Sequence, residues 1–164
     1  MYKVPNLRLV VQHKDMACWY ASARMLIQWK RHQVRATLRD HPDPAQVNLT
    51  VGWEVNNLGV TNPQIIQLAK TLGLKTVPPM SPTLGMIREL LHRYGPLWTN
   101  GKSHIVVVGG IDEAARGSLL IYDPWPPGKG TIEWRKLDWY VGSTKAPDSR
   151  DTSPDVQAVF LYHP

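Results

Sequence analysis

Apolar residues follow different patterns in the two halves of the chain. Over residues 17–30 apolar or small side chains occur on most sides of a helix, which indicates a helix buried in the interior. The polar stretch before it contains Asp15, which is the candidate N-cap. Weak alternation over residues 7–11 predicts a short strand before that stretch.

Two further helices are predicted from their start and stop signals. The first starts at Asn62-Pro63 and ends at Gly73, and the second follows Ser81-Pro82 and ends before Gly95-Pro96. A cap followed by proline starts a helix, and glycine after the last turn ends it. Residues 37–59 are rich in proline and asparagine, and we interpret them mainly as loop with at most a short helical turn.

Beyond Pro96 the pattern changes to short runs of β-branched and aromatic residues. The predicted strands are 97–99, 104–110, 118–122, 131–134 and 156–162. Their close spacing favours an antiparallel sheet, so the fold class is α+β: an N-terminal helical part whose central helix packs on a C-terminal antiparallel β-sheet. Neither a repeat nor a linker interrupts the sequence, so we expect residues 1–164 to form a single domain.

Composition narrows the class of protein. A chain of 164 residues with 43% hydrophobic content can bury one core, and its single cysteine, Cys18, excludes an intramolecular disulfide. The N-terminus has no apolar segment typical of a secretion signal, and no run reaches the roughly 18 apolar residues that span a bilayer. We therefore expect a soluble protein with no membrane partner, whose export would need a route other than the general secretory one.

The net charge of +6 comes from 19 Lys and Arg against 13 Asp and Glu, and one dense basic stretch contains Lys30, Arg31, Arg35 and Arg39. Such a field attracts nucleic acid or an acidic partner, but it also keeps a small domain in solution. No aromatic residues interleave with these charges as a base-stacking platform requires. The pattern therefore favours a solvated face over a nucleic-acid site.

Cys18 is the candidate nucleophile. A cysteine nucleophile reacts as its thiolate, and the start of a helix favours negative charge. Amide hydrolysis also needs donors directed at the developing oxyanion, and a side-chain amide upstream of the helix can join the backbone N–H of the nucleophile. Gln12, six residues before Cys18, is the candidate for this oxyanion hole.

The candidate base and its orienting carboxylate come from two consecutive predicted strands. His104 opens one strand and Asp123 closes the next. In an antiparallel hairpin the start of one strand lies beside the end of its partner, so His104 and Asp123 should meet. The weaker alternatives are His13 as base and Asp112 as third residue, because His13 has no evident carboxylate and Asp112 lies near the hairpin turn.

The residues give less support to a metal site, a cofactor site or an aromatic substrate cleft. No Cys or His pair has the spacing of metal ligands, so we predict no metal and no cofactor. Trp53, Trp98, Trp125 and Trp139 could line a substrate cleft, but we assign none of them, because tryptophan is more often a packing residue.

The segment from Gln12 to Cys18-Trp19 resembles the oxyanion glutamine and nucleophile of the papain family, with the same six-residue step. The runs 104–110 and 122–124 are more similar to the peptidase domains of double-glycine-cleaving bacteriocin exporters and to papain-fold bacterial effectors. The resemblance covers four short motifs from Gln12 to about Trp125. Plant and lysosomal papains have disulfides, a longer chain and usually asparagine as third residue, so the reduced bacterial branch fits better.

This resemblance implies a cysteine endopeptidase that acts on a protein substrate, with cleavage after small residues or Gly-Gly. It also implies a bacterial effector or antibacterial toxin, delivered by a specialised secretion system into the cytoplasm of a target cell, and a cognate immunity protein for the producing cell. The alternatives are a Cys-His-Asp deamidase or transglutaminase acting on glutamine, and a non-enzymatic nucleic-acid-binding domain in which Cys18 is structural.

Overall fold

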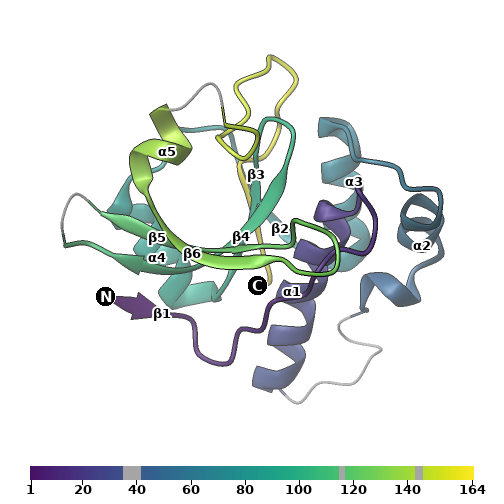
Figure 1. The fold of residues 1–164 in the computed structure, drawn as a ribbon, viewed down its shortest axis with the longest axis horizontal. Helices are drawn as coiled ribbons and strands as arrows, with labels where there is room; N and C mark the ends of the chain where they lie inside the picture. The colour runs from purple at the N-terminus through teal and green to yellow at the C-terminus, as the bar shows by residue number, and fades with distance from the viewer. Residues whose placement is uncertain (35–41, 115–116, 143–145) are drawn as a thin grey trace.

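The helices α1, α2 and α3 lie on one side of the molecule and a curved sheet on the other (Figure 1). The computed structural model describes residues 1–34, 42–114, 117–142 and 146–164. Its helices are α1 (Cys18–Val34), η1 (Pro44–Gln46, a 3-10 helix), α2 (Asn48–Val55), α3 (Asn62–Leu72), α4 (Leu84–Tyr94) and α5 (Leu137–Gly142). Its strands are β1 (Tyr2–Lys3), β2 (Lys75–Val77), β3 (Leu97–Asn100), β4 (Ile105–Asp112), β5 (Ser118–Asp123), β6 (Thr131–Lys136) and β7 (Phe160–Tyr162). The predicted α+β class is confirmed.

Antiparallel pairing joins all the described strands. The sheet order is β2-β7-β3-β4-β5-β6, and β1 pairs with the far end of β4. The last strand of the chain, β7, therefore lies between β2 and β3, inside the sheet. All five strands predicted beyond Pro96 are present with shifted ends, whereas β1 and β2 were not predicted.

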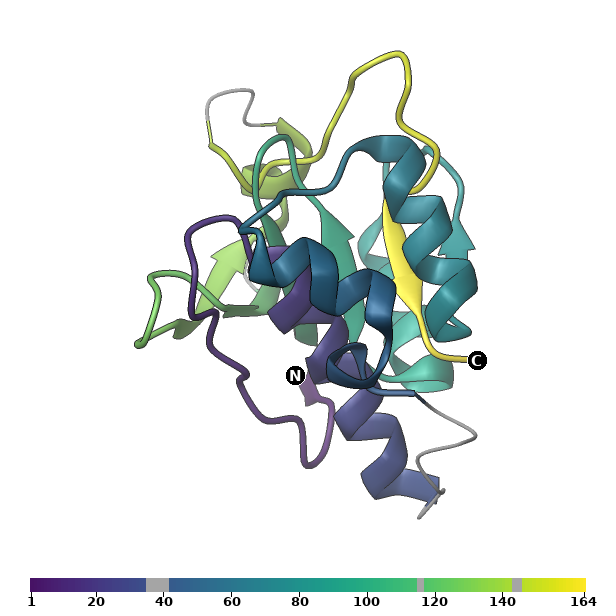
Figure 2. The ribbon, with the colours of Figure 1, turned by 90° about the vertical axis from the view of Figure 1, so that its right-hand side faces the viewer.

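Helix α1 is the central helix that the apolar pattern predicts. Its buried side chains include Trp19, Met25 and Ile27, and it contacts β3 and β4. Two polar groups connect it to those strands: the Ser22 hydroxyl donates to the Ile105 carbonyl at 3.3 Å, and the Trp98 indole N–H donates to the Trp19 carbonyl at 3.4 Å. Figure 2 shows α1 and α2 in front of the sheet. These contacts fix the start of α1 against β3 and β4.

The two helices predicted from capping signals are present. Helix α3 starts after Thr61, which forms a capping box with Gln64, and it ends at Gly73, whose φ of +68° suits glycine. Helix α4 starts after Thr83, which accepts from the Met86 backbone N–H. In both cases the cap is a threonine close to the predicted polar residue. At α4 the Thr83 oxygen accepts the Met86 N–H, and at α3 the Thr61 N–H donates to the Gln64 side chain.

Two predictions near the N-terminus are wrong. Asp15 is not the N-cap: α1 begins at Cys18, and the Ala17 carbonyl accepts from the Ala21 N–H. Residues 7–11 form no strand. Their alternation arises because Leu7 packs in the core while Arg8 is exposed, and no neighbouring strand pairs with this segment.

The interpretation of residues 37–59 as mainly loop is also wrong for the part that the structure describes. Residues 44–46 form η1 and residues 48–55 form α2. The buried carboxylate of Asp43 caps η1 and pairs with Arg24 of α1 at 3.0 Å. These tertiary contacts stabilise helical turns in a sequence whose composition suggests a loop.

Residues 35–41, 115–116 and 143–145 lie outside the described part of the chain. The predicted basic residues Arg35 and Arg39 therefore lie outside the described residues. Of the other residues in the basic stretch, Arg31 lies 3.7 Å from Asp43, and the Lys30 ammonium donates to the Pro164 carbonyl. Among the described helices, none has the length and apolar character needed to cross a lipid bilayer.

Candidate active site

Cys18 is the first residue of α1 and is partly exposed. The backbone N–H groups in the first turn of a helix have no partner within that helix, and they create a positive potential there. The first turn of α1 contains no acidic residue that would oppose this potential. The first turn of α1 therefore places backbone N–H donors beside Cys18, where an oxyanion could accept from them.

His104 and Asp123 meet as the hairpin argument predicts. Strand β4 begins at Ile105, directly after His104, and β5 ends at Asp123. These strands are antiparallel neighbours, and the His104 Nε2–H donates to Asp123 Oδ1 at 2.7 Å. Because Nε2 is occupied by the carboxylate, Nδ1 is the ring nitrogen that is left for Cys18.

The electrostatics of His104 favour the charged imidazolium. Burial alone would lower its pKa, and its side chain is only 15% exposed. The hydrogen bond to Asp123 and the interactions with Cys18 outweigh burial and raise the pKa of His104 from 6.5 to about 10. His104 therefore carries a positive charge at neutral pH, and it interacts with both Cys18 and Asp123.

Asp123 is held by more than the histidine. Its Oδ1 also accepts the backbone N–H of Trp125 at 2.9 Å, and its Oδ2 lies 3.5 Å from the Arg135 guanidinium. The carboxylate is 6% exposed. Buried carboxylates need such partners, and these two donors, one at each oxygen, hold the carboxylate in place beside the imidazole.

Arg135 connects the site to the rest of the sheet. It extends from β6, pairs with Glu133 and with the buried Asp148, and its guanidinium lies 4.6 Å from the Trp139 ring centre. Arg135 and Asp148 were not among the residues predicted for the site. Their meeting depends on the β5–β6 pairing and on the path of residues 146–150, and neither has a local signal in the sequence.

Gln12 is buried beside the loop that follows Asp123. Its backbone N–H donates to the Pro124 carbonyl, and its own carbonyl accepts from the Gly128 N–H. Its side-chain N–H groups donate to the carbonyls of Lys14 at 2.7 Å and Asp15 at 3.0 Å, and its buried Oε1 has no hydrogen-bond partner among the described residues. Gln12 can therefore donate to an oxyanion only after its amide rotates or shares an N–H.

The weaker candidates lie away from this cluster. His13 is exposed on the loop before α1, and no contact connects it to Asp123 in the described structure. Asp112 lies at the far end of β4, where it faces the N-terminal ammonium at 3.7 Å. Among the tryptophans considered for a substrate cleft, Trp98 is in the core and Trp53 packs edge-on against Trp19. The described residues include no group of three or more His, Cys, Asp or Glu side chains placed to hold a metal ion.

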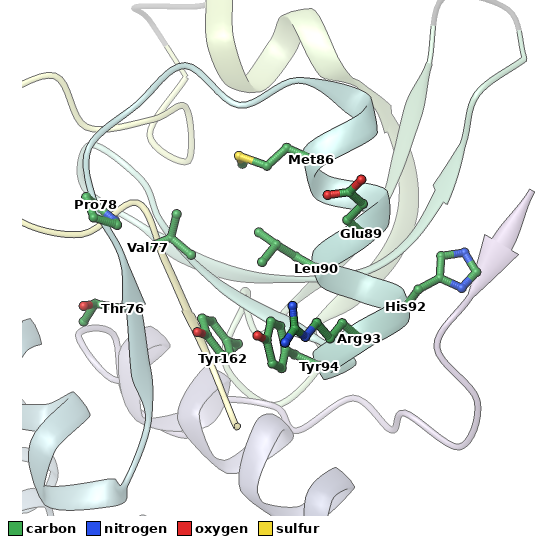
Figure 3. A pocket seen from close by; sticks show the side chains of 10 residues that line it. All are labelled: Thr76, Val77, Pro78, Met86, Glu89, Leu90, His92, Arg93, Tyr94 and Tyr162. Carbon is green, nitrogen blue, oxygen red and sulfur yellow. The ribbon is translucent and has the colours of Figure 1, made fainter.

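Of two cavities in the described structure, one is lined by predicted site residues and the other is not. One of about 300 Å³ lies at His104 and Asp123, and Trp125, which is 45% exposed, also lines it. A larger one of about 650 Å³ lies between α4 and the strands β2 and β7, where Tyr94 stacks on Tyr162 (Figure 3). The larger cavity contains none of the predicted site residues, so the smaller one is the candidate reaction cleft.

A central helix that starts at a cysteine, packed on an antiparallel sheet, is the architecture of a papain-like cysteine protease. Residues 1–144 match the family described as papain-like cysteine protease AvrRpt2, and the chain belongs to this family. It is therefore a cysteine protease, a hydrolase of a bacterial effector family, which acts on protein. Membership sets aside the non-enzymatic nucleic-acid-binding alternative. A comparison with curated proteins gave no match.

Proposed function

We propose that this protein is an endopeptidase in which Cys18 is the nucleophile, His104 the general base and acid, and Asp123 the orienting carboxylate. The observation that carries the proposal is the 2.7 Å hydrogen bond between His104 and Asp123, in a cluster where His104 also interacts with Cys18. This order of groups leaves one imidazole nitrogen for the thiol and fixes the other.

The reaction follows from these positions. In the resting pair His104 is already protonated at neutral pH and holds the proton that Cys18 gives up, so the Cys18 thiolate adds directly to the scissile carbonyl. The oxyanion of the tetrahedral intermediate accepts from the Cys18 backbone N–H and from Gln12 after its amide rotates. As the C–N bond breaks, His104 protonates the leaving amine. Water, deprotonated by His104, then hydrolyses the thioester and restores the thiol.

The biological role is proposed from family membership. We infer that the protein is an effector or antibacterial toxin that a specialised secretion system delivers into the cytoplasm of a target cell, where it cleaves a protein after small residues or Gly-Gly. A producing cell would then need an immunity protein that covers the Cys18 cleft. We also propose that residues 1–164 act as one peptidase domain, because β7 lies inside the sheet between β2 and β3.

Mass spectrometry of new protein N-termini tests this function. Bacterial and eukaryotic lysates are incubated with wild type and with the matched control Cys18→Ala. Peptide-bond hydrolysis predicts new N-termini with wild type alone. Glutamine deamidation or glutamine–amine cross-links without new N-termini would instead show a deamidase or transglutaminase, which uses the same thioester. Equal products from both proteins would contradict a Cys18 nucleophile.

A further inference from the structure

The 300 Å³ cavity lies on the histidine side of the reaction cleft. Its walls include His104, Asp123 and Trp125, and Cys18 is not among them. If Cys18 and His104 act as proposed above, the acyl part of the substrate is bonded to Cys18 and the leaving amine takes its proton from His104. The cavity is therefore placed to receive the residue that follows the cleaved bond.

The charge in this cavity comes from Asp15. Of the three carboxylates that line it, Asp123 and Asp148 are bound by His104 or Arg135. Asp15 is exposed, and within the described residues its carboxylate forms no hydrogen bond or ion pair. The lining contains no lysine or arginine among the residues that the structure describes. The positively charged His104 in the same lining is bonded to Asp123, so Asp15 is the lining carboxylate without a bound cation among the described residues. Its negative charge is therefore available to a cationic side chain of the substrate.

Two further features fix how a side chain would be held. The Asp15 carbonyl accepts from the buried Gln12 amide at 3.0 Å, which ties the backbone of this loop to the site. On the same cavity, Trp125 presents an indole that is 45% exposed. An aliphatic stem that ends in a cation covers an aromatic surface and keeps its charge at the polar rim.

We propose that this cavity is the subsite for the residue directly after the cleaved bond and that it selects lysine or arginine, with Asp15 as the specificity-determining residue and Trp125 as the surface for the stem. This inference rests on the proposed function. Neighbouring Lys14 does not cancel the Asp15 charge, because its ammonium binds the carbonyls of Glu54 and Val55.

A peptide library made by glutamyl-endopeptidase digestion of a bacterial lysate provides the test, because such peptides keep internal lysine and arginine. Wild type should cleave preferentially before these residues. Two synthetic peptides that differ only by lysine or glutamine after the cut then measure the preference as a ratio of kcat/KM. Asp15→Asn should lower this ratio roughly fivefold, and Asp15→Lys should favour a glutamate peptide. Trp125→Ala should also lower it.

The control is Glu89→Gln, which removes an exposed carboxylate from the distant cavity at α4 and should leave the ratio unchanged. Cys18-dependent cleavage without a basic preference, or with a ratio that Asp15→Asn does not change, would overturn this inference and leave the proposed function intact. No Cys18-dependent cleavage of any peptide would overturn both.

Discussion

His104 has a different neighbour at each ring nitrogen, and its charge depends on both. Asp123 accepts from Nε2, and Cys18 is the partner left for Nδ1. Asp123 itself is held from the other side by Arg135 and by the Trp125 N–H. The carboxylate therefore cannot rotate away from the imidazole at little cost.

Substitutions of Asp123 should separate its two effects on His104, which are the orientation of the imidazole ring and the stabilisation of its positive charge. In Asp123→Asn the amide oxygen can still accept from His104, but the NH2 group must face the Arg135 donors, so kcat/KM should fall about tenfold. In Asp123→Ala nothing accepts from Nε2, and the fall should be roughly 100-fold. In wild type the pKa of His104, about 10, sets the alkaline limb of the pH–rate profile. In both variants this limb should move to lower pH.

Steady-state kinetics between pH 6 and 10.5, on a peptide taken from the N-terminus experiment, measures these effects. Wild-type rates and an unchanged alkaline limb in Asp123→Ala would refute the role of this carboxylate.

At the residue scale, sequence reasoning reached the His104–Asp123 pair because both residues lie at strand ends in one hairpin. It did not reach Arg135 or Asp148, since each arrives from a segment whose path only the folded sheet determines. The catalytic roles of Cys18, His104 and Asp123 stay predictions. The position of Gln12 before the helix could be predicted from the sequence, whereas the direction of its amide depends on the carbonyls of Lys14 and Asp15.

At the scale of elements, the connection from β3 to β4 positions His104. The backbone N–H groups of Lys102 and Ser103 donate to the carbonyls of Ser149 and Pro147, so residues 146–150 hold the turn. Gly101 is the first residue of this turn, and backbone atoms of His104 and Asp148 lie very close to it. A Cβ there would lie 2.2 Å from the His104 carbonyl oxygen and 2.7 Å from the Asp148 Cα.

Gly101→Ala should therefore displace His104 or the 146–150 segment. Both clashing atoms are backbone, so the strain cannot be relieved by a side-chain rotation. We expect the Tm to fall by roughly 4–10 °C, with reduced kcat/KM in the protein that stays folded. Differential scanning calorimetry measures the first effect. Gly52→Ala in α2, where no atom lies within 4 Å of the new Cβ, should not lower the Tm. Equal behaviour of the two variants would contradict this account.

Elements with a strong local signal were predicted, and elements that depend on tertiary contacts were not. Helices α3 and α4 have capping residues and terminal glycines in the sequence. Helix α2 lacks such signals: its N-cap is Val47, without a side-chain hydrogen bond, and its place depends on Trp53 packing on Trp19. The short strands β1 and β2 pair with residues more than 80 positions away, so no window of sequence reveals them.

At the scale of the whole molecule, the active site contributes to folding stability in a pH-dependent way. The pKa of His104 is raised from 6.5 in the unfolded chain to about 10 in the folded protein. A group with a raised folded-state pKa stabilises the fold fully below its unfolded pKa, and this contribution is lost as the pH rises through the folded value. The relevant window is therefore pH 6.5 to 10.

Urea unfolding of wild type and His104→Gln across this window tests the linkage. The difference in free energy of unfolding between the two proteins should be largest near pH 6 and should shrink steadily toward pH 10. A difference that stays constant or grows with pH would mean that His104 is not stabilised as an imidazolium in the folded protein.

The central claim is that Cys18 and His104 form an activated pair, and alkylation of the thiol tests it most directly. Cys18 is the single cysteine, so intact mass reports its labelling by limiting iodoacetamide in wild type and in His104→Ala between pH 5 and 9, native and unfolded. The account predicts fast labelling of native wild type below pH 7 that falls by roughly tenfold or more in His104→Ala. Slow labelling of the native protein that accelerates only on unfolding, with no effect of His104→Ala, would identify a buried structural thiol and contradict the account.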